Sequence, residues 1–298
     1  MAAAPPYVPL AWEEVPCPFC GSDDASLYER FGSALQYTYV LCRRCRLVYS
    51  SPRPRYDAHF VEAAYASYYQ LTDTVALGPD TLVRESSVPM FREEVAHLVQ
   101  FDARRSAVLD VGSGMGTFLF AAKPLYEEAV GLDVSPRMAA FVEAQLGVRV
   151  HLDRFEDFVH PRKFSLIHMS HVLEHVPDPN RWLRKAASLL DDGGILAVNV
   201  PNKFSAGARV QHLAYRLRLK RQFQRGWSDP ARTPDHLFEP TLPSMRFLLA
   251  RNGYEILDHH SYSRRDPASR RTPLARLVHR GLKVGSNLAF VARPRRAG

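Results

Sequence analysis

The chain has 298 residues, of which 46% are hydrophobic and 23% are charged, and its formal net charge is +8. This composition is ordinary for a globular protein, so disorder along the whole chain is excluded. The amino-terminal stretch lacks the basic start and apolar core of a secretion signal, and no segment approaches the roughly 18 apolar residues of a membrane span. We therefore expect a soluble, cytoplasmic protein without a membrane segment.

The charge is unevenly distributed along the sequence. From residue 203 to the end there are 20 Lys and Arg against 6 Asp and Glu, which leaves a net charge of −6 for the first 202 residues. A basic carboxy-terminal third indicates an acidic or phosphate-bearing partner. A solvated basic surface without a partner is the alternative.

The first recognisable unit of the chain is cysteine-rich, and we assign it to residues 1–55. Its four cysteines, in the spacing C-x2-C-x21-C-x2-C, are Cys17, Cys20, Cys42 and Cys45. Two strand-like segments, 27–32 and 37–42, lie between the two pairs and predict a small hairpin. Four thiolates close a tetrahedron around Zn²⁺ without an open position, so we expect a zinc ribbon with a structural metal. A redox or metal-free arrangement is the alternative.

Two helix-like segments follow the cysteine-rich unit, at residues 57–71 and 82–101, with a Gly-Pro-Asp turn between them. Their apolar residues recur at helical spacing. We therefore expect residues 56–105 to form linking helices.

From residue 106 the pattern changes to alternating strands and helices. We expect strands at 107–112, 129–135, 148–152, 164–170 and 195–202, and helices at 117–125, 136–147 and 179–194. This alternation predicts a parallel sheet with helices on both faces. The domain at 106–298 continues with a basic helical insertion at 203–235, a helix at 241–253 and strands at 254–262 and 286–294.

A glycine-rich turn, DVGSGMG at 110–116, lies between the first of these strands and its helix. Glycine lets the backbone approach a ligand closely. Asp133 ends the second strand, where a carboxylate can accept both hydroxyls of a ribose. Dinucleotide sites favour G-x-G-x-x-G, whereas G-x-G-x-G after an aspartate suits a cofactor with an amino-acid end in place of a phosphate.

These motifs carry a resemblance to a known family. In order, VLDVGSGMGTFL, GLDVSPRM, FSLIHMSHVLEHVPDP and GGILAVNVPN resemble the class I S-adenosylmethionine (SAM)-dependent methyltransferases over about residues 84–294. The resemblance implies a Rossmann-like, seven-stranded α/β sheet with SAM as the cofactor. One departure is Ser165, where the family usually has Asp, but that position is normally structural.

The resemblance also implies roles for individual residues. The three glycines at 112, 114 and 116 would wrap the methionine part of SAM, Asp133 would bind its ribose, and the end of the fourth strand would lie beside the sulfonium. The implied cofactor-binding residues are Asp110, Gly112, Ser113, Gly114, Gly116, Asp133, Val134, Phe155, Glu156, Met169, Ser170 and Tyr68.

The order of the units resembles the zinc-ribbon methyltransferases of natural-product and deoxysugar pathways. Tyr68 and Tyr69 resemble aromatic residues that close over cofactor and substrate, which makes 56–105 a cofactor lid. In C-methylating relatives an acidic residue followed by His supplies the base, and Asp235-His236 occupies that place. A neighbouring carboxylate makes an imidazole more basic and fixes its tautomer. His171 is a further catalytic candidate.

Residues 171–175 read HVLEH, a string also found in inverted zinc peptidases. There both His side chains share one face of a long helix, whereas here we expect a strand end and a turn closed by Pro177-Asp178-Pro179. A peptidase is therefore disfavoured. Glu174 and His175 remain candidates for a divalent ion, as in some quinone O-methyltransferases.

We expect methyl transfer to a small molecule, either anionic or tethered to a carrier protein, with O-methylation slightly favoured over C- or N-methylation. One alternative is an RNA methyltransferase that holds nucleic acid with the ribbon and the basic region. It is disfavoured because HMSH stands where base-methylating enzymes have an Asn/Asp-Pro-Pro-Tyr motif. Another alternative is a non-catalytic SAM-binding module.

Overall fold

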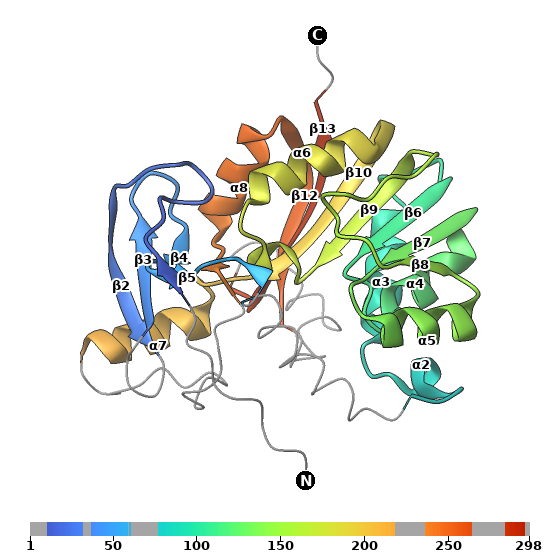
Figure 1. Cartoon of the computed structure of the whole chain (residues 1–298), viewed down its shortest axis with the longest axis horizontal. Coiled ribbons are helices and arrows are strands. Elements are labelled where there is room, and N and C mark those ends of the chain that lie inside the picture. Colours follow the sequence, from blue (N-terminus) through green and yellow to red (C-terminus); the bar gives the residue numbers. More distant parts are fainter. Residues whose placement is uncertain are drawn as a thin grey trace.

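The structure of the protein, a computed structural model, describes residues 11–31, 37–58, 60, 77–217, 236–263 and 284–295. Figure 1 shows a small antiparallel sheet, drawn in blue, beside a larger sheet flanked by helices. None of the helices in these ranges is long and apolar enough to cross a lipid bilayer.

The small sheet contains the predicted hairpin. Its strands are β2 (Ala25–Phe31), β3 (Tyr37–Cys42), β4 (Val48–Ser50) and β11 (Phe238–Glu239), in the order β11-β4-β3-β2. A two-residue pair, β1 (Trp12–Glu13) with β5 (Arg53–Pro54), lies beside it. Because β11 comes from the carboxy-terminal third of the chain, the ribbon is hydrogen-bonded to the main domain.

The large sheet has seven strands in the order β12-β13-β10-β9-β6-β7-β8. They are β6 (Ala107–Val111), β7 (Glu128–Leu132), β8 (Arg149–His151), β9 (Phe164–Ser170), β10 (Leu190–Pro201), β12 (Tyr254–Tyr262) and β13 (Asn287–Pro294). Strands β6 to β10 run parallel, and β13 is antiparallel to both of its neighbours. The predicted Rossmann-like sheet of seven strands is confirmed.

Helices cover both faces of this sheet. The helices of the described residues are α2 (Thr81–Arg84), α3 (Val88–Leu98), α4 (Thr117–Ala122), α5 (Pro136–Leu146), α6 (Pro179–Leu189), α7 (Ala206–Arg216) and α8 (Leu242–Arg251), with short 3-10 turns η1 (Lys123–Leu125) and η2 (Leu173–His175). Of these, α7 lies beside the ribbon strands and not on the large sheet. Successive residues of a strand point to opposite faces of a sheet. In β10, Leu196 packs with α6 and α8 on one face, and Ala197 packs with α3 and α4 on the other. Helix α5 joins the α4 side.

Two predicted helices have different limits in the structure. The helix expected at 179–194 ends at Leu189, and the residues after it already belong to β10. A Cβ on Gly194 would lie 2.9 Å from the carbonyl oxygen of Phe164, so glycine allows the chain to pass close to β9 there. The helix expected at 82–101 is broken after α2, where Glu85 accepts hydrogen bonds from Ser87. The predicted lid helix at 57–71 lies almost entirely outside the described residues.

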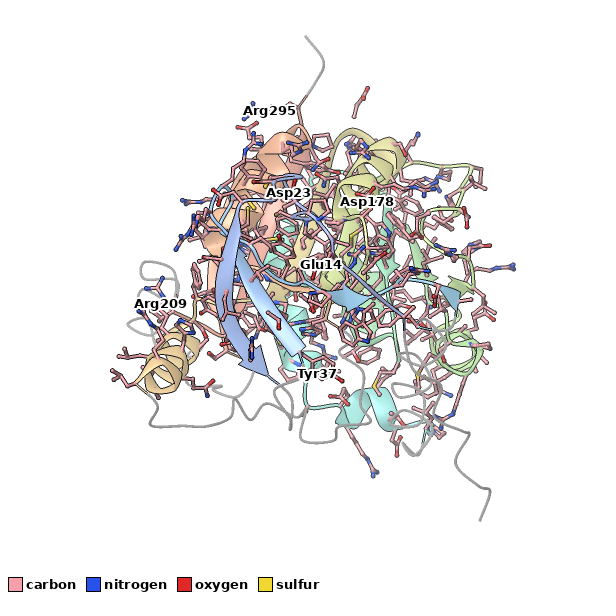
Figure 2. All side chains as sticks on the ribbon, turned by 60° about the vertical axis from the view of Figure 1, so that its left-hand side comes forward. Glu14, Asp23, Tyr37, Asp178, Arg209 and Arg295 are labelled. Carbon is pink, nitrogen blue, oxygen red and sulfur yellow. The ribbon has the colours of Figure 1, made fainter. Side chains whose placement is uncertain are left out.

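The ribbon packs against the side of the main domain that carries α6 and α8. Phe19 meets Phe238 edge-on with ring centroids 5.0 Å apart, and Asn180 donates to the carbonyl of Pro18 at 2.8 Å. In Figure 2 the ribbon strands lie in front of these helices, and Arg209 marks α7 beside them. The four cysteines belong to the same buried cluster as the main sheet, so the two parts share one core.

Candidate functional site

The turn after β6 depends on glycine. Gly112, Gly114 and Gly116 have φ values of 72°, 51° and 79°, in the left-handed region that favours glycine. A Cβ on Gly112 would lie 2.5 Å from Val172 Cγ2, and one on Gly116 would lie 2.7 Å from Val142 Cγ2. The bare backbone of the turn therefore packs directly against the segment after β9 and against α5.

Asp133 braces this turn from the neighbouring strand. Its Oδ2 accepts the N–H of Gly114 and its Oδ1 accepts the N–H of Ser135, both at 2.8 Å. A carboxylate has about four acceptor positions, so it retains capacity for ligand hydroxyls. Within the described part of the chain, the buried Oγ of Ser113 in the same turn has no hydrogen-bond partner. The turn thus has both acceptor capacity and an unsatisfied polar atom.

A buried charge network that the sequence did not reveal lies beneath the turn. His168 of β9 has its Nδ1 2.7 Å from Asp110 Oδ1 and its Nε2 3.4 Å from Glu94 Oε1. Its ring stacks on Phe118, with centroids 3.7 Å apart. Asn199 of β10 also donates to Glu94. Asp110, one of the residues predicted to bind the cofactor, is therefore itself held by an imidazole and linked to α3.

His168 carries a positive charge inside this network. Burial alone lowers the pKa of an imidazole, but Asp110 and Glu94 outweigh it and raise the pKa of His168 to about 9. The hydrogen bond from His168 likewise lowers the pKa of Glu94 against the opposing effect of burial. The only hint of this network in the sequence was a histidine, His168, within an otherwise apolar strand. The register of β6 and β9 places His168 opposite Asp110, which explains why a polar side chain is accommodated there.

We expect the free energy of unfolding to fall as the pH rises from about 6.5, the ordinary value for His, to about 9. A pKa raised on folding stabilises the protein below the unfolded-state pKa, and this contribution disappears as the folded-state pKa is passed. The contribution is about 3 kcal/mol by linkage. Urea unfolding of the zinc-loaded protein at several pH values measures it. His168→Gln, which cannot be protonated, should lack this pH dependence. If the free energy of unfolding changed equally with pH in the native chain and in His168→Gln, the charge assigned to His168 would be contradicted.

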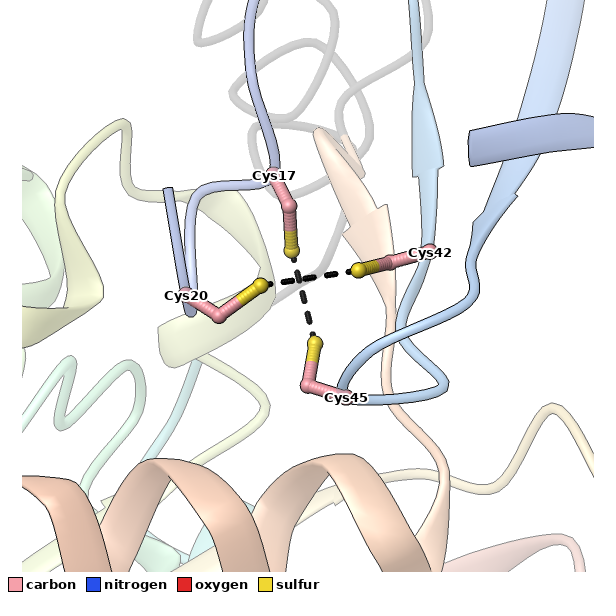
Figure 3. A group of neighbouring side chains, drawn as sticks. All are labelled: Cys17, Cys20, Cys42 and Cys45. Carbon is pink, nitrogen blue, oxygen red and sulfur yellow. Dashed lines mark hydrogen bonds between the residues drawn. The ribbon is translucent and has the colours of Figure 1, made fainter. Parts of the chain in front are cut away.

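The four cysteine thiols converge on one point in the ribbon (Figure 3). The Sγ atoms of Cys17 and Cys45 are 3.4 Å apart, and those of Cys20 and Cys42 are 3.5 Å apart. All four cysteines are buried and none is in a disulfide. These separations suit a tetrahedral ion with Zn–S bonds of about 2.3 Å. The donor set fits a closed structural zinc site, as predicted.

The HVLEH string does not form a peptidase helix. Strand β9 ends with Met169 and Ser170, and His171 follows with a left-handed φ of 57°. Glu174 and His175 lie in η2, so no long helix presents two His on one face. Glu174 is fully buried, with its Oε1 3.2 Å from His171 Nδ1. The prediction of a strand end followed by a turn is confirmed.

His236, two residues before β11, lies against this segment. Its ring meets that of His175 edge-on, with centroids 4.8 Å apart, and ligand atoms of Glu174, His175 and His236 all lie within 4.8 Å of one another. The N–H of Leu237 donates to the carbonyl of Glu174 at 2.9 Å. Although burial raises the pKa of Glu174, the surrounding imidazoles lower it overall. We call Glu174, His175 and His236 the acidic–histidine cluster.

The carboxylate partner that the structure gives His236 was missed from the sequence. Nδ1 of His236 lies 3.2 Å from Oε1 of Glu239. Asp235, the predicted partner, lies outside the described residues, as do Tyr68 and Tyr69. The roles predicted for these three residues stay predictions.

Three further residues predicted to bind the cofactor, Val134, Phe155 and Glu156, lie on the loops after β7 and β8. Val134 follows Asp133 and is 40% exposed, which is unusual for a large apolar side chain. Phe155 is buried, with its ring centroid 4.8 Å from that of Trp182. Oε1 of Glu156 lies 3.5 Å from a guanidinium nitrogen of Arg154. Contact of these side chains with a ligand stays a prediction.

Comparison with known families decides the class of this protein. Residues 89–259 match the family described as "Methyltransferase domain". The chain belongs to this methyltransferase family. Residues 7–50 match the "PaaD zinc beta ribbon domain". Both the predicted resemblance to methyltransferases and the predicted zinc ribbon are therefore confirmed.

Curated methyltransferases match part of the chain. A ubiquinone biosynthesis O-methyltransferase of Xanthomonas campestris pv. campestris is 32% identical over 106 residues, which cover 33% of this chain and 44% of the relative. A trans-aconitate 2-methyltransferase of Methylobacterium radiotolerans is 33% identical over 114 residues, which cover 38% of this chain and 44% of the relative. The chain thus spans less than half the length of these relatives.

Solved methyltransferases share the fold. Magnesium protoporphyrin IX methyltransferase of Synechocystis PCC 6803 is similar with a TM-score of 0.52 and 15% identity, over 80% of this chain and 100% of that one. 1,6-Didemethyltoxoflavin-N1-methyltransferase of Burkholderia thailandensis has a TM-score of 0.52 and 17% identity, over 90% of this chain and 100% of that one. At such identities the likeness supports the methyltransferase fold alone.

Proposed function

We propose that the protein transfers a methyl group from SAM to a small molecule or to a carrier-tethered biosynthetic intermediate. One observation carries the proposal: the glycine turn, Asp133, and the pair Glu174 and His175 follow the neighbouring strands β6, β7 and β9 at their carboxyl ends, and His236 lies against that pair. Open α/β sheets bind ligands at that edge. A cofactor turn and a candidate proton acceptor thus lie at the same edge of one sheet.

The residues of the turn fit SAM. Its bare backbone, the unsatisfied Ser113 Oγ and the acceptor capacity of Asp133 suit a cofactor with amino, carboxylate and ribose hydroxyl groups. We assign the methionine part to residues 110–116, the ribose to Asp133 and the adenine to Val134, Phe155 and Glu156. Residues 169–171 and Tyr68 are assigned to the neighbourhood of the sulfonium. When bound, SAM supplies an electrophilic methyl group.

The acceptor needs a group that takes up its proton, and we assign this role to His236. Glu239 beside Nδ1 favours the tautomer with its proton there, so Nε2 is the basic nitrogen. Buried Glu174 adds a negative charge that stabilises the imidazolium formed by proton uptake. His171, bonded to the same carboxylate, is the second candidate, and Tyr69 and Asp235 are assigned to the acceptor side.

We favour O-methylation. The support is one relative named as an O-methyltransferase and the pair Glu174 and His175, whose carboxylate and imidazole are able to hold a divalent ion while Nε2 of His236 takes up the proton. Such an ion would lower the pKa of an acceptor hydroxyl. The basic carboxy-terminal third supports an anionic acceptor.

Calorimetry with S-adenosylhomocysteine on folded, zinc-loaded protein tests the cofactor assignment. We expect measurable binding for the native chain. Asp133→Ala removes two hydrogen bonds that shape the turn and any bond to ribose, so affinity should fall at least about tenfold, or about 1.4 kcal/mol. Asp80→Ala, which removes an exposed carboxylate, should bind normally.

No binding to the native chain would overturn the proposal. Binding without transfer would instead identify a non-catalytic module. Isotopically labelled SAM, incubated with candidate metabolite extracts and the protein, separates these outcomes by mass spectrometry of the products.

A further inference from the structure

Two histidines and an aspartate meet outside the site described above. His97 lies in the last turn of α3, and Asp258 and His260 lie on the edge strand β12. Nε2 of His97 is 2.9 Å from Oδ2 of Asp258, and Nδ1 of His260 is 3.4 Å from the same oxygen. Three ligand atoms, one from each side chain, all lie within 4.8 Å of one another. We call this group the edge-strand cluster.

The backbone explains why these side chains converge. Asp258 and His260 are two residues apart on a strand, so both point to the same face. A register irregularity between Ile256 and Asp258 interrupts the pairing with β13 just before them, and such bulges re-aim side chains. His259 points to the other face, where its ring stacks on Phe290.

The chemistry of the cluster matches a metal site better than an ion pair alone. A tetrahedral ion with bonds of about 2.0–2.1 Å separates its ligand atoms by about 3.3 Å, close to the two distances observed. The three side chains are 20%, 30% and 28% exposed, which leaves room for water as a further ligand.

We propose that His97, Asp258 and His260 bind a divalent transition-metal ion of the zinc class. Two imidazoles and a carboxylate suit Zn²⁺, Co²⁺ or Ni²⁺ and disfavour Mg²⁺ or Ca²⁺, which prefer oxygen ligands. The ion fastens α3 to an edge strand of the sheet. Because Glu94 precedes His97 by one helical turn, the ion also steadies the helix that holds Asn199 and His168.

Metal content and thermal melting test this site. After saturation with Zn²⁺ and desalting, the native chain should retain one more equivalent of zinc than Asp258→Asn or His97→Gln. His259→Gln, on the same strand but the opposite face, should retain the native amount. With the ribbon already filled, added Zn²⁺ should raise the melting temperature of the native chain and of His259→Gln by more than it raises that of Asp258→Asn or His97→Gln.

Cobalt distinguishes this site from the ribbon. Co²⁺ bound here should give weak visible bands without the sulfur charge-transfer bands of the four-thiolate site. These weak bands should lose intensity in Asp258→Asn and keep it in His259→Gln. Equal metal content and an equal melting response in the native chain and both variants would overturn the proposal. His260→Gln provides a third test if either variant fails to fold, and the acidic–histidine cluster is intact in all of them.

Discussion

His236→Ala should lower the rate of methyl transfer by about 100-fold to 10,000-fold, the usual contribution of a general base. Affinity for S-adenosylhomocysteine should be unchanged, because the glycine turn follows β6 and Asp133 follows β7, whereas His236 lies near β11. Glu239→Gln still offers an acceptor to Nδ1 but removes the charge beside it, so its loss should be smaller. Single-turnover transfer of labelled methyl groups, with calorimetry in parallel, measures both quantities.

A matched control and a competing base complete this experiment. His259→Ala removes a histidine that packs on Phe290 away from the site, and it should retain the native rate. Full activity of His236→Ala with intact cofactor binding would contradict the base assignment. In that case His171→Ala should show the loss instead, since His171 shares the buried carboxylate of Glu174.

The parallel part of the fold was predictable because its signals are local. Helix α5 begins at Pro136 after Ser135, whose side chain accepts the N–H of Met138, and it ends at Gly147 with a left-handed φ of 59°. These capping residues are visible in the sequence at their expected positions. The glycine turn and the cysteine spacing are equally local, so the sequence also predicted the position of the turn after β6 and the four-cysteine site.

Features that depend on long-range pairing were missed. Strand β11 has two residues, too few for a periodic pattern, and it exists because β4 pairs with it. Helix α3 turns Glu94 and not Glu93 towards the sheet, and this orientation depends on tertiary packing. The sequence therefore did not reveal that Glu94 is a partner of His168. Glu239 was overlooked for the same reason, since its position beside His236 follows from that pairing.

The ribbon should control the acceptor site and leave the cofactor turn intact. Across β4 and β11, Val48 pairs with Glu239 and Tyr49 pairs with Phe238, and Ser50 donates to the carbonyl of Leu237 at 3.1 Å. The strand that carries the partner of His236 is therefore hydrogen-bonded to the ribbon. Metal binding supplies about 10–16 kcal/mol to small zinc modules, so a ribbon without its ion should unfold.

Cys42→Ser, or removal of zinc by a chelator, should therefore lower methyl transfer at least about 100-fold, the range expected when a general base is displaced. S-adenosylhomocysteine should still bind, because β6 and β7 lie at the far end of the sheet from the ribbon. Asp24→Ala alters an exposed ribbon residue and should retain both properties. Full transfer by zinc-free protein would show that the ribbon does not position His236. Loss of cofactor binding together with transfer would contradict this prediction and show that the ribbon and the sheet unfold as one unit.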